Sequence, residues 1–157
     1  MSARLRQLAH AAFAMIMLAV ASCSGDGVTS SRQRLDLASA KQRWARFAPA
    51  SYQITVGRSC FCTPETTRPV IVTVRNGQVE SRRYEDTGAD VPSQFAPAYP
   101  SVDGLFGVID HAVAEHAATV DVLYDGARGF PVSIQIDGSP MIADDELYYG
   151  TRDFVVR

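Results

Sequence analysis

The sequence lacks several features that mark common functional classes, and each absence narrows what the protein can do. Basic residues are not in excess, since 15 Lys and Arg stand against 17 Asp and Glu, so no nucleic-acid partner is expected. No glycine-rich phosphate-binding loop is present, and neither Ser133 nor Ser139 lies in a nucleophile-elbow context. The longest apolar stretch, from about Leu8 to Val20, is shorter than the roughly 20 residues that a membrane-spanning helix needs.

The N-terminal segment has instead the layout of an export signal. Arg4 and Arg6 precede the apolar stretch, which leads into residues 18–23, LAVASC. A branched apolar residue, two small residues and a cysteine are typical of a lipobox. The sequence therefore predicts a lipoprotein signal peptide over residues 1–22 and lipid on Cys23, which attaches the exported chain to the cell membrane or the outer membrane. An ordinary secretion signal and an uncleaved anchor are the alternatives.

The remaining chain is long enough for one domain. Residues 23–31 are small and polar, which predicts a flexible tether, and residues 32–157 then form a single domain. A first helix is predicted over residues 32–48, with Leu37, Trp44 and Phe47 on one stripe, and Pro49 ends it. A second helix is predicted over residues 102–118, with Ser101 as its N-cap. Its apolar face is expected to consist of Val102, Leu105, Phe106, Ile109, Val113 and His116.

Strand patterns occupy most of the rest. Alternating or β-rich runs are found at residues 52–56, 69–75, 78–84, 119–124, 130–137 and 147–156. Asn76-Gly77 predicts a tight hairpin that places Val74 opposite Val79. Residues 85–100 lack strong periodicity and predict a long loop. The order helix, three strands, helix, three strands predicts an α+β fold, in which an antiparallel sheet of about six strands is covered on one face by two helices.

Cys60 and Cys62 are the first candidate for chemistry. In an extended strand, residues two apart are separated by about 6.5–7 Å between Cα atoms, whereas a disulfide needs about 4.4–6.8 Å. A disulfide between them therefore needs a bent backbone. A structural disulfide, a thiol-redox or sensing pair, a metal site and free thiols without function are the alternatives, and Arg58 is the one cationic neighbour near in sequence.

Histidines and carboxylates supply weaker candidates for a metal site. His111 and Glu115 share a helix face with Asp110 nearby, but His116 is not four residues from His111, as helical zinc sites require. Carboxylates at Asp137, Asp144, Asp145 and Glu146 could surround a calcium ion, although their spacing matches no EF-hand. A solvated helix face and a charged turn are the expected readings, so no metal and no cofactor is predicted.

The combination of these motifs resembles a known family. Its elements are Trp44, Tyr52-x-Ile54, Cys60-Phe61-Cys62, the Asn-Gly hairpin, Ser101 to Phe106, Tyr124-Asp125, Gly129-Phe130-Pro131, Ile134-x-Ile136-Asp137 and Asp144-Asp145-Glu146. They resemble the bacterial lipoprotein family catalogued as domain of unknown function 6174 over most of residues 44–156. The resemblance implies a small exported domain and no established activity.

These observations predict a non-enzymatic module of the cell envelope, attached to the membrane through Cys23, that binds an envelope protein or another envelope component. The loop at residues 85–100 and the exposed sheet face are its expected working surface. The alternatives are a thiol-redox protein using Cys60 and Cys62 and a metal-binding domain.

Overall fold

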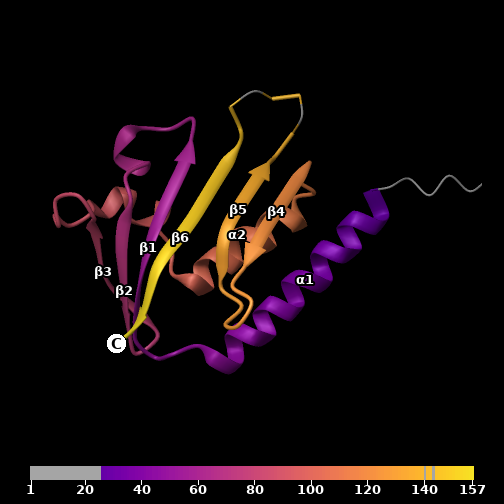
Figure 1. Cartoon of the computed structure of the whole chain (residues 1–157). Helices are drawn as coiled ribbons and strands as arrows, with labels where there is room; N and C mark the ends of the chain where they lie inside the picture. Colours follow the sequence, from indigo (N-terminus) through magenta and orange to yellow (C-terminus); the bar gives the residue numbers. More distant parts are fainter. Residues whose placement is uncertain (1–25, 140, 143) are drawn as a thin grey trace, which may run out of the picture.

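The computed structural model describes residues 26–139, 141–142 and 144–157. Its helices and strands are α1 (Asp26–Phe47), β1 (Tyr52–Cys60), β2 (Val70–Arg75), β3 (Gln78–Tyr84), α2 (Val102–Ala114), β4 (Thr119–Tyr124), β5 (Pro131–Asp137) and β6 (Leu147–Val156). Two short 3₁₀ helices, η1 (Pro64–Thr66) and η2 (Ser93–Ala98), lie in the connections. The predicted α+β order of helix, three strands, helix, three strands is confirmed (Figure 1).

The six strands form one antiparallel sheet in the order β3-β2-β1-β6-β5-β4. Each half of the chain therefore contributes a three-stranded meander, and the first strand of one half pairs with the last strand of the other. The hairpin at Asn76-Gly77 has positive φ at both turn residues, and Val74 lies opposite Val79, as predicted. The central strands β1 and β6 carry the longest run of pairing, from Tyr52 opposite Val156 to Cys60 opposite Leu147.

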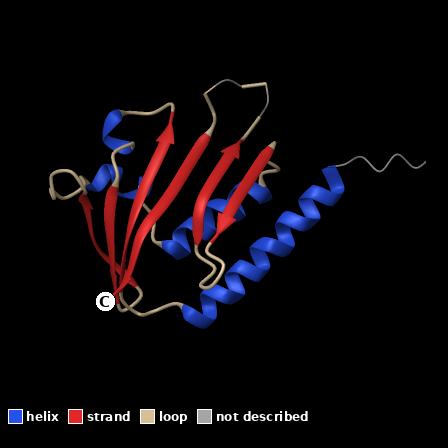
Figure 2. Ribbon diagram, viewed as in Figure 1, coloured by secondary structure: helices blue, strands red, loops and turns tan. Residues whose placement is uncertain are grey.

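The two helices pack against one face of the sheet, called here the covered face, and Figure 2 shows the opposite, open face without a helix. Strand alternation places Tyr52, Ile54 and Val56 of β1 on the covered face. The other fully or nearly buried side chains of this core include Val70, Val72, Val74, Val120, Ile134, Ile136, Leu105 and Ile109.

Helix α2 ends earlier than the sequence predicts. Ser101 caps its first turn by accepting a hydrogen bond from the Gly104 backbone N–H, as predicted. At the other end, the N–H of Ala117 donates to the Ala112 carbonyl, and His116 has φ of +57°. This is a Schellman cap, which ends the helix at Ala114 and places His116 outside it. The prediction that His116 belongs to the apolar helix face is therefore wrong, and Ala112 is the last buried residue of that face.

Helix α1 is longer than predicted, because it begins at Asp26, inside the segment assigned to a flexible tether. No proline interrupts residues 26–31, so the helix that starts in the domain can continue toward the N-terminus. Leu37 and Trp44 are buried on the predicted stripe together with Ala40. Phe47, the third residue of that stripe, remains 36% exposed.

Some backbone groups on the free edges of both outer strands have hydrogen-bond partners. Gln33 of α1 donates a side-chain hydrogen bond of 2.8 Å to the carbonyl of Val120 in β4. At the other edge, the N–H of Val91 donates to Arg82 of β3 and the N–H of Tyr84 donates to Ala89. These bonds occupy backbone groups that could otherwise pair with another chain.

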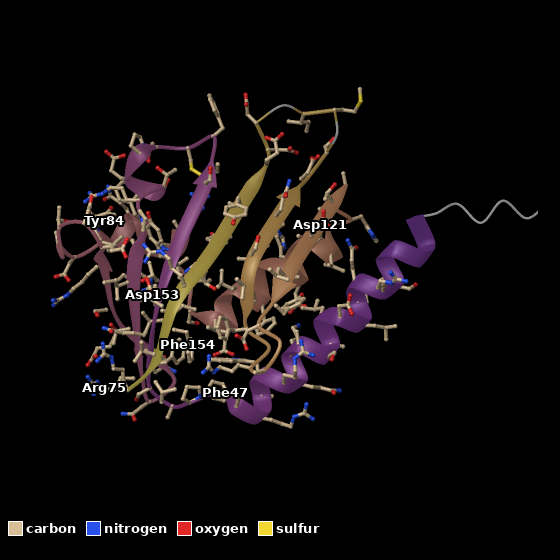
Figure 3. The ribbon with its side chains drawn as sticks, viewed as in Figure 1. Phe47, Arg75, Tyr84, Asp121, Asp153 and Phe154 are labelled. Carbon is tan, nitrogen blue, oxygen red and sulfur yellow. A yellow bond between two sulfur atoms is a disulfide. The ribbon has the colours of Figure 1, made fainter. Side chains whose placement is uncertain are left out.

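Aromatic rings hold the C-terminal end of α1 to the sheet. The Trp44 ring lies 5.7 Å from Tyr52, 6.3 Å from Phe130 and 5.9 Å from Phe154, each edge to face. Figure 3 shows Phe154 of β6 beside Phe47 at the end of α1. This cluster joins residues from the helix and from both halves of the sheet.

Candidate functional site

Cys60 and Cys62 form a disulfide at the end of β1, with a Cα–Cα distance of 5.3 Å. The backbone bends as the pairing requires, because the N–H of Cys62 donates a 2.9 Å hydrogen bond to the carbonyl of Cys60 across a three-residue turn. Phe61, the middle residue of that turn, is 81% exposed, and Cys62 is exposed beside it. We call residues 60–62 the disulfide turn.

Arg58 lies next to the disulfide turn on the covered face of β1. Its Nη1 donates a 3.2 Å hydrogen bond to the Cys62 sulfur, and its guanidinium carbon lies 6.0 Å from the centre of the Tyr149 ring. The register explains this contact, since Arg58 pairs with Tyr149 across β1 and β6. The Arg58 Nε is buried and has no hydrogen-bond partner among the described residues. The sequence identified Arg58 as a neighbour of the cysteines but not its contact with Tyr149.

Buried tyrosines lie beside this arginine. The hydroxyls of Tyr84 and Tyr99 both donate to the backbone carbonyl of Glu65, at 3.1 and 3.0 Å, which ties η1 to β3 and to the end of the 85–100 loop. The pKa of Tyr99 is raised to about 12, mainly by burial and also by the Tyr84 hydroxyl, while Arg58 and Arg68 lower it. Burial likewise raises the pKa of the Tyr149 hydroxyl, against the lowering effect of Arg58.

Two glycines face each other in the central strands of the open face. Gly57 and Gly150 lie directly opposite each other on the central strands β1 and β6. They line a shallow hollow that is open to solvent. The aromatic ring of Tyr148 lies at ordinary contact distance from the position that a Gly150 Cβ would take, and Arg152 borders the hollow further along β6.

The Arg152 side chain also crosses this face. It forms ion pairs with Asp153, its neighbour, and with Glu85 at the start of the 85–100 loop. A second ion pair, between Arg83 and Asp90 at 3.3 Å, holds the loop against the outer strand β3. The margin of the open face is therefore charged and internally paired.

The predicted working surface, the 85–100 loop together with the open face, is split by the structure. Residues 85–91 follow the edge of β3 through the bridge between Arg83 and Asp90. Residues 93–98 form η2, and Tyr99 that follows is fully buried in the core. Only the first part of the loop therefore borders the open face. The sequence missed this division because Tyr99 lies between prolines and shows no periodic pattern.

The helical metal candidates do not come together. Asp110 pairs with Lys41 of α1 at 2.5 Å, and His116 lies beyond the end of α2. His111 and Glu115 border a groove along α2 instead. Within the part of the chain that the structure describes, no group of three or more His, Cys, Asp or Glu side chains is placed to hold a metal ion.

The carboxylates before β6 are divided in the same way. Asp145 lies beside Gly138, whereas Asp144 and Glu146 line a hollow with Cys60 and Phe61 at the disulfide turn. One side-chain oxygen of Asp137 and one of Asp145 are buried without a hydrogen-bond partner among the described residues. Of these carboxylates, Asp144 and Glu146 are therefore the two that share a hollow with the disulfide turn.

The predicted lipidation site, Cys23, lies outside the described residues, as does the rest of the predicted signal peptide. Among the described residues, no helix has both the length and the apolar character needed to cross a membrane.

Comparison with protein families matches residues 36–156 to DUF6174, a family of unknown function. No curated protein matches the chain, and no solved structure matches it.

Proposed function

The chain belongs to the DUF6174 family of unknown function, and we propose that it is an exported, lipid-anchored protein of the cell envelope that binds a partner protein on the open face of its sheet. The anchoring rests on the lipobox that ends at Cys23. The binding rests on one observation, the hollow at Gly57 and Gly150 in the middle of a sheet face that neither of the described helices α1 and α2 covers.

Two paired glycines in central strands favour a binding role over a purely structural one. Glycine weakens a strand because it has no side chain to pack, and it often marks a place where a ligand or another backbone approaches closely. Here both strands carry glycine at the same level of the sheet. The margin of the hollow supplies Tyr148, which is 43% exposed, and Arg152. Tyrosine and arginine are enriched among the residues that dominate protein interfaces.

Filling the hollow tests the binding surface. A Cβ at Gly57 would meet only the Gly150 carbonyl, at an ordinary 3.7 Å, so Gly57→Phe should fold normally and occupy the hollow. We expect cross-linking in intact cells, followed by purification, to recover a specific partner with the native chain and at least tenfold less of it with Gly57→Phe. Gly57→Ala adds one methyl group and should retain most of the yield.

The open face is ruled out as the binding surface if Gly57→Phe, with an unchanged melting temperature, captures the same partner at the native yield. Deleting residues 86–97 is a poorer test, because it would also remove the Asp90 bridge and the Val91 bond that cover the edge of β3.

The anchor is tested separately by Cys23→Ser. Each buried lipid methylene contributes about 0.8 kcal/mol to membrane binding, so loss of the acylated thiol should release the chain or leave it unprocessed. We expect the variant to leave the membrane fraction after a carbonate wash, while the native chain stays with it. A variant that remained with the membrane at the native level would contradict lipid attachment at this cysteine.

A further inference from the structure

We propose that the disulfide turn is a thiol–disulfide exchange site, in which Arg58 stabilises Cys62 as the thiolate and the disulfide accepts two electrons from a dithiol of another exported protein. The inference does not depend on a partner at the open face. It rests on the contact between Arg58 and the Cys62 sulfur, and on the carboxylates that share a hollow with Cys60.

On the Cys62 side, the Arg58 guanidinium has neutral partners while the disulfide is intact. It donates to the Cys62 sulfur at 3.2 Å and lies over the neutral Tyr149 ring, and its Nε is buried without a partner. Among the described residues, no carboxylate forms an ion pair with it, in contrast to Arg68, Arg75, Arg83 and Arg152. Reduction would give this half-buried cation an anionic partner, the Cys62 thiolate.

Two carboxylates share a hollow with Cys60. Asp144 and Glu146 line the hollow that contains Cys60 and Phe61. Carboxylates disfavour a nearby thiolate, whereas an arginine favours it. Other titratable groups around the turn are Glu65 in η1, the Tyr84 and Tyr99 hydroxyls bonded to its carbonyl, Tyr149 on β6 and Arg68, which is paired with Asp86. The arrangement favours one thiolate, at Cys62, and one protonated thiol, at Cys60.

This asymmetry defines the steps of the exchange. A thiolate of the dithiol attacks the Cys60 sulfur, and the Cys60–Cys62 bond breaks with its electron pair going to Cys62, whose thiolate pairs with Arg58. The second thiol of the substrate then loses its proton and attacks the first substrate sulfur, which is bonded to Cys60 in the mixed disulfide. Cys60 is released and takes up a proton. The substrate dithiol is oxidised to a disulfide and the protein disulfide is reduced. The proton lost by the second thiol is balanced by the one that Cys60 takes up, so the one proton released overall is the one lost when the attacking thiolate forms from the dithiol. The disulfide returns by the reverse steps with a disulfide-bearing partner.

Two further features fit exchange better than structural bracing. The bridge joins residues two positions apart, so it closes a very small loop and removes little chain entropy from the unfolded state. The turn is also accessible, since Cys62 is exposed and Phe61 is 81% exposed. An exposed disulfide whose reduced form is stabilised by a cation is the arrangement that raises a reduction potential.

The test follows the alkylation of each thiol in the reduced full-length chain, in a Cys23→Ser background so that Cys60 and Cys62 are the remaining cysteines. Peptide mass spectrometry assigns the rate to each residue as the pH is varied. We expect the Cys62 rate to have its midpoint at least one pH unit below the value of about 8.5 for a free cysteine, and the Cys60 rate to have its midpoint at or above that value. This measurement needs no substitution at Arg58. A midpoint for Cys62 at pH 8.5 or higher would by itself overturn the proposal.

Variants then assign the effect to the arginine. Arg58→Gln should slow Cys62 alkylation at pH 6.5 about tenfold, whereas Arg58→Lys should retain part of the effect because it keeps the charge. The matched control is Arg68→Gln, which removes an arginine paired with Asp86 and stacked on Tyr84, and it should leave the Cys62 rate unchanged.

Equilibration of the same variants with glutathione gives an independent readout. A tenfold loss of preference for the reduced form in Arg58→Gln corresponds to a reduction potential about 30 mV more negative. An unchanged potential in a folded Arg58→Gln chain, together with an unchanged alkylation rate, would remove the arginine from the proposal. A merely structural role for Arg58 would lower the melting temperature without moving either quantity.

Discussion

Trp44→Ala is expected to lower the free energy of unfolding by about 3–5 kcal/mol, a large part of the 5–15 kcal/mol that stabilises a typical domain. Trp44 is the only tryptophan in the chain and is 4% exposed. Its ring contacts Tyr52, Phe130 and Phe154, and its Nε1 donates a 2.8 Å hydrogen bond to Asp103 of α2. The substitution therefore leaves a cavity where both helices and both halves of the sheet meet.

Urea denaturation followed by circular dichroism measures this loss without relying on tryptophan fluorescence. Phe47→Ala is the matched control, because Phe47 also touches the Trp44 ring but is 36% exposed. Phe47→Ala should lower the free energy of unfolding much less, since little of the space that the ring leaves is enclosed. Trp44→Phe keeps an aromatic ring but loses the hydrogen bond to Asp103. Its loss of unfolding free energy should therefore lie between those of Trp44→Ala and Phe47→Ala. A loss below about 1 kcal/mol for Trp44→Ala would show that the cluster does not hold α1 to the sheet.

Gly129→Ala is expected to have the second largest effect, because two costs coincide at this position. Gly129 lies in the turn between β4 and β5 with φ of +86°, a conformation that costs an L-residue roughly 1–2 kcal/mol. An added Cβ would also collide with the Ala40 carbonyl oxygen and would lie 2.8 Å from the Cβ of Arg43, both in α1. Overpacking of this kind typically costs about 1–3 kcal/mol more. Helix α1 must move away for the methyl group to fit.

Two other glycines separate these costs. Gly77→Ala places a methyl group at φ of +74° with nothing within 4 Å, so it should show the backbone cost alone. Gly126→Ala, in the same turn as Gly129, has open space and no positive φ, so it should be nearly neutral. Denaturation measures the total loss of unfolding free energy, which is the backbone cost plus the packing cost. Hydrogen exchange of the α1 amides reports the displacement of the helix. Equal losses for Gly129→Ala and Gly77→Ala would mean that the turn does not press against α1.

Much of the fold could be predicted from the sequence because the relevant signals are local. The Asn76-Gly77 turn fixes the register of its hairpin through the φ values it requires, and Ser101 marks the start of α2 through its capping bond. Local signals also produced the errors. Apolar spacing predicted a helix over residues 102–118, whereas a Schellman cap, which has His116 instead of glycine at its left-handed position, ends α2 at Ala114.

The candidate sites depended more on tertiary structure. Cys60 and Cys62 are evident in the sequence, and so is Arg58 four positions before Cys62. That Arg58 points to the covered face and meets Tyr149 follows only from the pairing of β1 with β6. The opposition of Gly57 and Gly150 follows from the same register. No local pattern encodes that register, because the two strands come from opposite ends of the domain.

The sequence by itself determined the elements, their order, the alternation of the strands and the residues able to carry thiol chemistry, since backbone propensity and hydrophobic period act within a few residues. Only the tertiary structure decided which strands are neighbours, where α1 and the 85–91 segment bond to the outer strands, and which charged groups lie beside the disulfide turn. Those outcomes depend on packing between distant segments, where the burial of side chains such as Trp44, Tyr99 and Tyr149 selects one arrangement from many that the local signals allow.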